Sequence, residues 1–186
     1  MIGYAFCGSY CTIGQSLSQL RGLRDSGLDI LPIMSDNVYN YDTRFFRAED
    51  LRMRVENICG RKIIHTIVEA EPLGPVVTLD ALVISPCTGN TLAKLACGIT
   101  DTPVCMAAKA HLRADRPLLI ALSTNDALSA NLKNISVMLE KKSVFFVPMK
   151  QDAPETKPHS LSACFDLVPE ALRMALEGRQ MKKLFL

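Results

Sequence analysis

Runs of consecutive apolar residues alternate along the chain with segments whose apolar residues recur every three or four positions. The first pattern is typical of strands buried on both faces, and the second of helices with one buried face. The expected strands cover residues 2–7, 28–34, 63–67, 81–84, 117–122 and 144–148. The expected helices cover residues 13–23, 43–59, 92–99 and 132–139, and a last helix ends near Gly178. Pro32 predicts an irregularity in the second strand, because proline cannot donate a ladder hydrogen bond.

This alternation of strands and helices predicts the fold class. Strand–helix–strand units connect by right-handed crossovers and build a parallel sheet. We therefore predict an α/β fold, namely a doubly wound, Rossmann-like parallel sheet of about six strands with helices on both faces. Residues 1–186 are expected to form a single domain. The loops at 71–74 and 150–158 are expected to have little structure of their own and to reach a neighbouring molecule.

Composition and charge narrow the functional classes. The chain has 186 residues, of which 48% are hydrophobic, and its net charge of +2 is too small to indicate nucleic acid or an anionic membrane as partner. The apolar runs are too short to span a bilayer, and the amino-terminal residues lack the pattern of a secretory signal. Seven cysteines without a CxxC pair indicate no metal site, and most are expected to be buried in a protein of the reducing cytoplasm.

Small polar residues follow several of the expected strands. They occur at Gly8-Ser9, at 35–37, at 85–91 and at 123–125. In a parallel sheet these loops meet at one edge, where helix amino ends offer free N–H groups suited to a phosphate. Each loop taken alone is explained by helix capping, but capping does not require two or three such residues in every loop. The four loops together predict a ligand pocket.

The absence of two nucleotide-binding motifs narrows the choice of ligand, and three side chains each have two possible roles. The chain has neither GxGxxG after its first strand nor GxxxxGK[ST], so a mononucleotide is favoured over a dinucleotide or a P-loop nucleotide. Lys94 lies on either a solvated helix face or the pocket wall. Cys87 is either a buried residue or a nucleophile at a helix start. His65 on an apolar strand is more often a core or rim residue than a catalyst.

The segment Ser85-Pro86-Cys87-Thr88-Gly89-Asn90-Thr91 resembles the Pro–small–Ser–Ala–Asn–Thr motif of flavoproteins in the family of FMN-binding cysteine decarboxylases. Thr88 stands in the place of the motif's serine, Gly89 in the place of its alanine, and Asn90 and Thr91 match. Gly8-Ser9 is similar to the family's phosphate-binding turn. Further segments at 70–75, 100–110, 116–128 and 145–154 extend the resemblance over nearly the whole chain.

The resemblance implies FMN as cofactor and assigns roles to particular residues. The residues implied to bind the cofactor are Gly8, Ser9, Ser35, Pro86, Thr88, Gly89, Asn90, Thr91, Ser123 and Thr124. Asn90 and Lys94 are the candidates for catalysis. Ala107 and Ala108 are expected at the substrate pocket, since they lie where the decarboxylases carry Pro-Ala-Met-Asn. The phosphate is expected among Gly8, Ser9, Ser35 and the amino end of the helix after Asn90, rather than among Arg44, Arg47 and Arg52.

Three functions follow from the resemblance. The favoured one is a flavin-binding subunit of an oxidoreductase that converts a cyclic dicarboxylate precursor to an aromatic product, together with a nicotinamide-binding partner subunit. A free-standing FMN-dependent decarboxylase or flavin prenyltransferase is the second, and a non-catalytic scaffold with an empty mononucleotide pocket is the third. The family implies a homo-oligomer, either a trimer or a dodecamer. The favoured function implies the cytoplasm of the mother cell of a sporulating bacterium.

Overall fold

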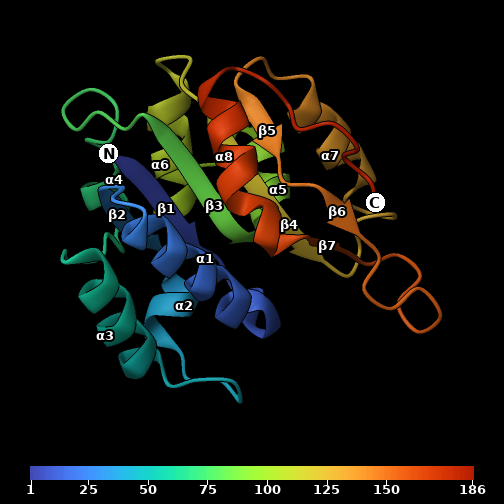
Figure 1. The fold of residues 1–186 in the computed structure, drawn as a ribbon, viewed down its shortest axis with the longest axis horizontal. Coiled ribbons are helices and arrows are strands. Elements are labelled where there is room, and N and C mark those ends of the chain that lie inside the picture. Colours follow the sequence, from blue (N-terminus) through green and yellow to red (C-terminus); the bar gives the residue numbers. More distant parts are fainter.

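The buried apolar runs of the sequence form one seven-stranded sheet, which a computed structural model describes together with the rest of residues 1–186 (Figure 1). The strand order is β2-β1-β3-β4-β7-β6, and β5 also pairs with β4. The strands are β1 (Ile2–Phe6), β2 (Ile30–Met34), β3 (Ala81–Cys87), β4 (Leu118–Thr124), β5 (Val144–Phe146), β6 (Met149–Lys150) and β7 (Leu161–Ala163).

One edge of β4 is divided between two partners. Its first half pairs in parallel with β5, whereas Ser123 and Thr124 pair antiparallel with β7. β7 in turn pairs antiparallel with β6. The sheet is therefore parallel over β2, β1, β3, β4 and β5, as predicted, but it ends in an antiparallel hairpin. The sequence did not predict this hairpin, because its strands are only two and three residues long.

Helices cover both faces of the sheet, as the α/β pattern predicts (Figure 1). Residues of α1, α3 and α8 pack on one face, and residues of α4, α5, α6 and α7 pack on the other. The helices are α1 (Ile13–Asp25), α2 (Asp36–Asn40), α3 (Ala48–Cys59), α4 (Ile67–Ala70), α5 (Gly89–Cys97), α6 (Pro103–Leu112), α7 (Leu132–Leu139) and α8 (Val168–Leu176). None of them is both long and apolar enough to cross a membrane.

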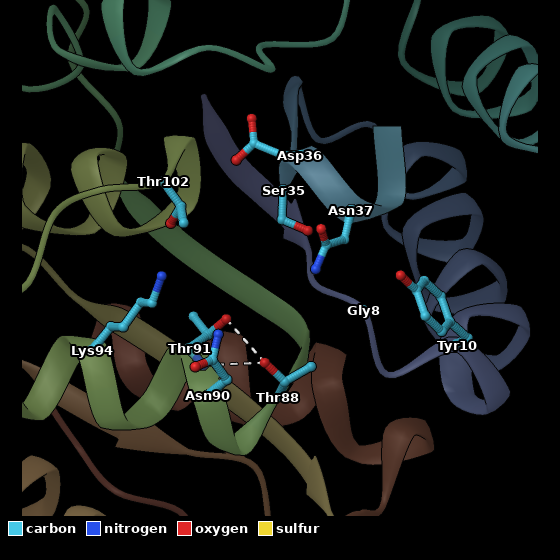
Figure 2. Close-up of a pocket in the computed structure, with 10 residues that line it drawn as sticks. All are labelled: Gly8, Tyr10, Ser35, Asp36, Asn37, Thr88, Asn90, Thr91, Lys94 and Thr102. Carbon is cyan, nitrogen blue, oxygen red and sulfur yellow. Dashed lines mark hydrogen bonds between the residues drawn. The ribbon is translucent and has the colours of Figure 1, made fainter. Parts of the chain in front are cut away.

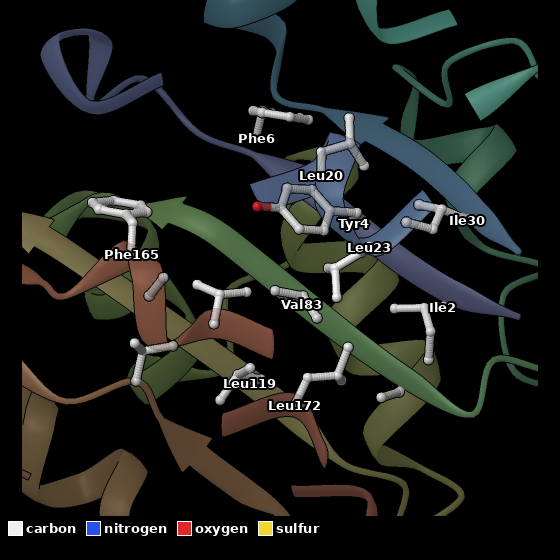
Figure 3. Packing of buried hydrophobic residues seen from close by; sticks show 14 of the residues in the cluster. Ile2, Tyr4, Phe6, Leu20, Leu23, Ile30, Val83, Leu119, Phe165 and Leu172 are labelled. Atoms are coloured by element: carbon white, nitrogen blue, oxygen red, sulfur yellow. The ribbon is translucent and has the colours of Figure 1, made fainter. Parts of the chain in front are cut away.

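Alternate residues of the central strands fill two separate cores. Tyr4 and Phe6 of β1 belong to the core on the α1 side (Figure 3), whereas Ala5 belongs to the core on the α6 side. All five residues of β1 are buried, which is the pattern of a strand covered on both faces. Four of the seven cysteines are also buried, and all seven are free thiols.

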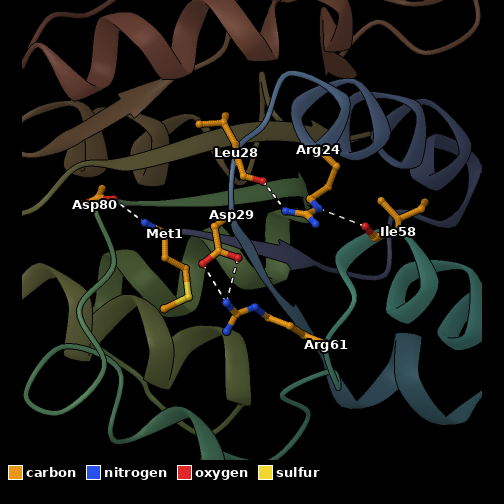
Figure 4. Close-up of polar contacts among 7 residues, drawn as sticks. All are labelled: Met1, Arg24, Leu28, Asp29, Ile58, Arg61 and Asp80. Carbon is orange, nitrogen blue, oxygen red and sulfur yellow. Dashed lines mark hydrogen bonds and ion pairs between the residues drawn. The ribbon is translucent and has the colours of Figure 1, made fainter.

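Polar contacts hold the end of the sheet where β1 begins (Figure 4). Arg61 donates two hydrogen bonds of 2.9 and 2.8 Å to the carboxylate of Asp29, and the amino terminus lies 2.5 Å from Asp80. Arg24 donates to two backbone carbonyl oxygens, those of Leu28 and Ile58. The polar loops lie at the opposite end of the sheet.

Three expectations about individual elements are wrong. Residues 63–67 do not form a strand, because only Ile64 bridges to β2 and Thr66 then caps α4 with a capping box. The helix expected from residue 43 begins only at Ala48, since the Thr43 hydroxyl accepts hydrogen bonds from the amides of the next turn. Pro32 causes no shift in the pairing of β2 with β1.

Candidate functional site

A polar cavity of about 300 Å³ lies at the carboxyl ends of β1 and β3 (Figure 2). The chain leaves β1 toward α1 on one face of the sheet and leaves β3 toward α5 on the other, so this is the point where ligands bind in open α/β sheets. The residues that line it are Gly8, Tyr10, Ser35, Asp36, Asn37, Thr88, Asn90, Thr91, Lys94 and Thr102.

The amino end of α5 forms one wall of this cavity. Thr88 caps the helix, since its hydroxyl accepts a 3.1 Å hydrogen bond from the amide of Thr91 and lies 3.0 Å from the Thr91 hydroxyl (Figure 2). The amides of Gly89 and Asn90 belong to the first turn and have no carbonyl partner within the helix. The partial positive charge of the helix end favours an anion here.

Ser35 supplies a second polar group to the cavity. It precedes α2, and its hydroxyl oxygen is buried without any hydrogen-bond partner. Buried polar atoms are almost always paired, so an unpaired one on the wall of a polar cavity is a place where a ligand atom or an ordered water would supply the partner. A phosphate oxygen would accept this hydrogen bond, and the residues present therefore fit the phosphate of a mononucleotide.

A second cavity of about 470 Å³ adjoins the first. The two share Gly8, Tyr10 and Thr88, and the second extends toward β4 and the β6–β7 hairpin. The other residues that line it are Ser9, Cys11, Thr12, Arg44, Phe45, Ser123, Thr124, Asn125, Asp152, Lys157 and Ser160. Together the cavities form a polar region along the carboxyl ends of β1, β3 and β4.

Most of the residues expected to bind a cofactor lie on these two cavities. Gly8, Ser35, Thr88, Asn90 and Thr91 line the first. Gly8 and Thr88 also line the second, together with Ser9, Ser123 and Thr124.

Pro86 and Gly89 lie behind the cavity wall instead. The Pro86 carbonyl accepts a 3.1 Å hydrogen bond from the Cys7 amide, which ties β1 to β3, and a cis bond joins Pro86 to Ser85. Gly89 is buried, and a Cβ there would lie only 2.5 Å from the Asn131 side-chain nitrogen and 2.6 Å from the Thr124 hydroxyl. Both residues therefore shape the turn.

The structure places Ala107 and Ala108 elsewhere. Both are fully buried on α6, in the core between that helix and the sheet, and neither lines the first or the second cavity. The reason is the helix itself, which begins at Pro103 after the cap Thr102 and turns these alanines inward. The residue of this region that lines the cavity is Thr102, the amino-terminal cap of α6. The expected substrate pocket at the two alanines is thus replaced by core packing.

The structure decides between the alternative roles of Lys94, Cys87 and His65. Lys94 lines the cavity, but its ammonium group forms an ion pair of 2.8 Å with Asp101. Cys87 is fully buried, and this burial raises the pKa of its thiol well above the usual range, so it is not an activated nucleophile. His65 stacks on Tyr39 with ring centres 3.8 Å apart, outside both cavities.

Sequence reasoning missed several residues on the cavity walls. Two of them carry a local signal in the sequence. Tyr10 directly follows the Gly8-Ser9 turn, and Thr102 begins a helix as part of a Thr-Pro pair. Arg44, Asp152 and Lys157 carry no local signal. Tertiary structure alone brings their two loops to the end of the sheet.

Known proteins resemble this chain in sequence and in fold. The family model described as flavoprotein matches residues 1–170. The B subunit of dipicolinate synthase from Bacillus subtilis (strain 168) is 41% identical over 97% of this chain and 90% of its own length. The crystal structure of the same B subunit from Bacillus halodurans C has a TM-score of 0.91 at 37% identity and covers 100% of this chain and 95% of that one. The FMN-dependent cysteine decarboxylase SpaF shares the fold, with a TM-score of 0.65 at 24% identity over 94% of this chain and 95% of its own.

Proposed function

Because the chain belongs to the flavoprotein family, we propose that it acts as the B subunit of a dipicolinate synthase and binds FMN at the carboxyl ends of β1 and β3. In this role it takes part in the oxidation of a dihydrodipicolinate-type precursor to dipicolinate during sporulation. The extent and level of its similarity to the Bacillus subtilis protein support this function over that of its more distant relatives.

The observation that carries the cofactor assignment is the unpaired Ser35 hydroxyl on the wall of the first cavity. It lies on the same cavity as Gly8 and as Asn90 at the amino end of α5, and no arginine lines that cavity. These groups would hold the FMN phosphate through neutral donors and a helix end. Ser9, Thr88, Ser123 and Thr124 would contact the remainder of the cofactor along the second cavity.

The chemistry requires an electron acceptor. The precursor becomes aromatic by losing a hydride and a proton, and no ordinary side chain accepts a hydride. Either FMN, when bound, would supply that acceptor, or the nicotinamide of the partner subunit would take the hydride while this chain shapes the complex. The protein's part is to bind and orient, and the Asn90 amide, with two donor hydrogens and one acceptor oxygen, is suited to orient the cofactor from the wall of the phosphate cavity. Lys94 is the other candidate, with Asp101 as its ion-pair partner.

A partner completes the proposed enzyme. The name of the Bacillus relative implies that dipicolinate synthase has a second polypeptide, its A subunit, and we assign the nicotinamide-binding role to that partner. The present chain is proposed to act as a single domain within a homo-oligomer, either a trimer or a dodecamer, in the cytoplasm of the mother cell. A relative with this fold is described as dodecameric.

The absorption spectrum of the purified chain tests the cofactor. We expect the protein to be yellow as isolated, or to become so on adding FMN and removing the excess by gel filtration. A colourless protein that retains no flavin contradicts the proposal and leaves the scaffold function.

Two further assays separate the related activities. A free-standing cysteine decarboxylase would release carbon dioxide from a peptide with a carboxyl-terminal cysteine, and a flavin prenyltransferase would alter the flavin spectrum with a prenyl phosphate. The family resemblance suggests both activities as alternatives, and we expect neither here.

A further inference from the structure

The second cavity contains two cationic side chains that no other group neutralises strongly. Arg44 forms no ion pair, is exposed, and its guanidinium lies 4.8 Å from the centre of the Phe45 ring. Lys157 has one carboxylate partner, Asp152, at 3.5 Å. Both members of that pair are about half exposed, at 55% and 40%, and such surface pairs contribute little free energy. Each cation is therefore available to an anionic ligand.

These two cations reach the cavity from opposite edges of the sheet. Arg44 lies between α2 and α3, in the segment that follows the edge strand β2, and Lys157 lies in the connection between β6 and β7 (Figure 1). The strands between these edges are β1, β3 and β4. The cavity thus has one cation from each side, and neutral hydroxyls such as Ser9 and Ser123 lie on its wall.

This charge pattern differs from that of the first cavity. There the one lysine is already paired with Asp101, and the groups free to meet a ligand are hydroxyls, amides and a helix end. Backbone amides, hydroxyls and a helix end suit the phosphate in the first cavity. A guanidinium binds a carboxylate or a phosphate with two parallel hydrogen bonds, so with the phosphate held in the first cavity the two cations of the second remain for carboxylates. The two cavities therefore favour different anions.

We infer that the second cavity also binds a cyclic dicarboxylate, beside the part of the cofactor proposed to enter it, with Arg44 on one carboxylate and Lys157 on the other. Binding breaks the weak pair between Lys157 and Asp152 and replaces it with the ligand's carboxylate. This inference rests on the proposed function, because it names the site of that reaction's substrate and product. It assigns specificity for two carboxylates to two loops that lie far apart in the sequence.

Calorimetric titration of the full, FMN-supplemented chain tests the inference. The probe is pyridine-2,6-dicarboxylate, and pyridine-2-carboxylate is the matched probe with one carboxylate fewer. We expect Arg44→Gln and Lys157→Gln each to weaken binding of the dicarboxylate roughly tenfold to a hundredfold, the loss of a charge-assisted contact. The control variants Arg47→Gln and Lys150→Gln, whose side chains do not line this cavity, are expected to bind as the unchanged chain does.

A third variant, which removes the carboxylate partner of Lys157, is expected to change the dicarboxylate affinity in the opposite direction. Asp152→Asn removes the carboxylate that competes for Lys157, so we expect it to bind the dicarboxylate more tightly. A variant that merely disturbed the loop would bind it more weakly. Unchanged or weaker binding by Asp152→Asn argues against the inference.

The bound flavin, measured by absorbance in the same samples, separates the two proposals. Loss of dicarboxylate binding with flavin retained supports the inference. Flavin binding with equal dicarboxylate affinity in all variants, or no dicarboxylate binding by the unchanged chain, overturns it and leaves the proposed cofactor standing. Loss of flavin from Arg44→Gln also overturns it, because the arginine would then serve the phosphate. Absence of flavin throughout, with dicarboxylate binding still dependent on Arg44 and Lys157, refutes the cofactor and keeps this site.

Discussion

Two buried serine hydroxyls differ in whether they are paired. Ser16 donates to the Ser85 carbonyl oxygen at 2.5 Å and lies 3.0 Å from the Tyr4 hydroxyl, so it joins α1 to β1 and β3. Ser35 is paired with nothing, although its hydroxyl is equally hidden from solvent. A fully bonded hydroxyl stabilises the fold, whereas an unbonded one costs free energy that a bound partner returns. The contrast separates a structural serine from a binding one.

Replacement of each serine by alanine should therefore have opposite effects. We expect Ser35→Ala to leave the free energy of unfolding of the flavin-free chain unchanged or to raise it by about 1 kcal/mol, while FMN binds more weakly. Ser16→Ala, the matched control, is expected to lower the free energy of unfolding by about 1–3 kcal/mol, since it leaves buried partners unpaired. Urea unfolding and flavin titration measure the two quantities. Equal destabilisation by both variants would show that Ser35 has a hidden partner in solution.

Asn90 permits a second test at the scale of one side chain. Asn90→Asp keeps the size of the side chain but replaces its donor with a negative charge on the wall of the proposed phosphate cavity. We expect flavin affinity to fall roughly tenfold to a hundredfold, or about 1.5–3 kcal/mol, with the melting temperature nearly unchanged. Asn57→Asp on the exposed surface of α3 is the control. An unaltered titration curve for Asn90→Asp would remove this residue from the site.

At the scale of elements, local signals in the sequence located most of the strands and helices. Gly60, in the left-handed region, ends α3, and such a stop can be read directly, whereas the helix expected over 92–99 ran past Gly98, which ends α5. The hairpin of β6 and β7 could not be read, because its pairing with β4 depends on residues far away in the chain. The same holds for the site: the loops after β1, β2, β3 and β4 were predicted, but the arrival of Arg44 and Lys157 was not.

The end of α6 carries a pH-sensitive contact. His111 is buried, and its Nε2 atom lies 2.8 Å from the Pro117 carbonyl oxygen, just before β4 begins. Burial lowers the pKa of His111 below its ordinary value, against the opposing effect of the hydrogen bond to Pro117. The unfolded chain therefore binds a proton at a pH where the folded chain does not. Stability from this residue is present above the unfolded value of about 6.5 and is lost as the pH falls below it.

We expect the free energy of unfolding to decrease between about pH 7 and about pH 5.5 and this decrease to be smaller in His111→Gln. Urea unfolding at several pH values gives the slope for each protein. His159→Gln on the exposed loop before β7 is the control and should keep the slope of the unchanged chain. Identical slopes for all three proteins would show that His111 does not govern the acid limit.

At the scale of the whole molecule, only one of the two loops expected to reach a neighbour projects from the fold. The 71–74 segment packs down instead, with Leu73 buried and Gly74 close against the Ala110 carbonyl. The connection between β6 and β7 extends away from the sheet on the side of the cavities (Figure 1). It is therefore the segment through which we expect a partner protein to approach the proposed site.

The proposed division of labour predicts that this chain alone makes no dipicolinate. Adding the nicotinamide-binding partner should restore synthesis from the cyclic precursor, followed by the ultraviolet absorbance of the product. Asn90→Asp, combined with the same partner, should lower the rate. Turnover by this chain alone would refute the two-subunit enzyme, and full turnover by the partner alone would reduce this chain to an accessory.

The close approach of Gly89 to the loop after β4 links two positions that are distant in the sequence. The side-chain amide of Asn131 and the hydroxyl of Thr124 occupy the space that an alanine methyl would need at position 89. The Asn131 amide also donates 2.9 Å to Asp126 and accepts 2.8 Å from Asn134, so it cannot move aside without breaking both contacts. The identities of residues 89 and 131 should therefore be epistatic.

We expect Gly89→Ala to lower the free energy of unfolding by about 1–3 kcal/mol, the usual cost of overpacking. In the background of Asn131→Ala the same change should cost less, because the nearest of the three atoms in the way of the methyl is gone, while the Thr124 hydroxyl and the Asp126 carboxylate remain at 2.6 and 2.8 Å. Urea unfolding of the four proteins gives the coupling. Additive effects would exclude it. We therefore expect alanine at position 89 to be better tolerated after the asparagine has been shortened, so the contact favours one order in which the two mutations accumulate.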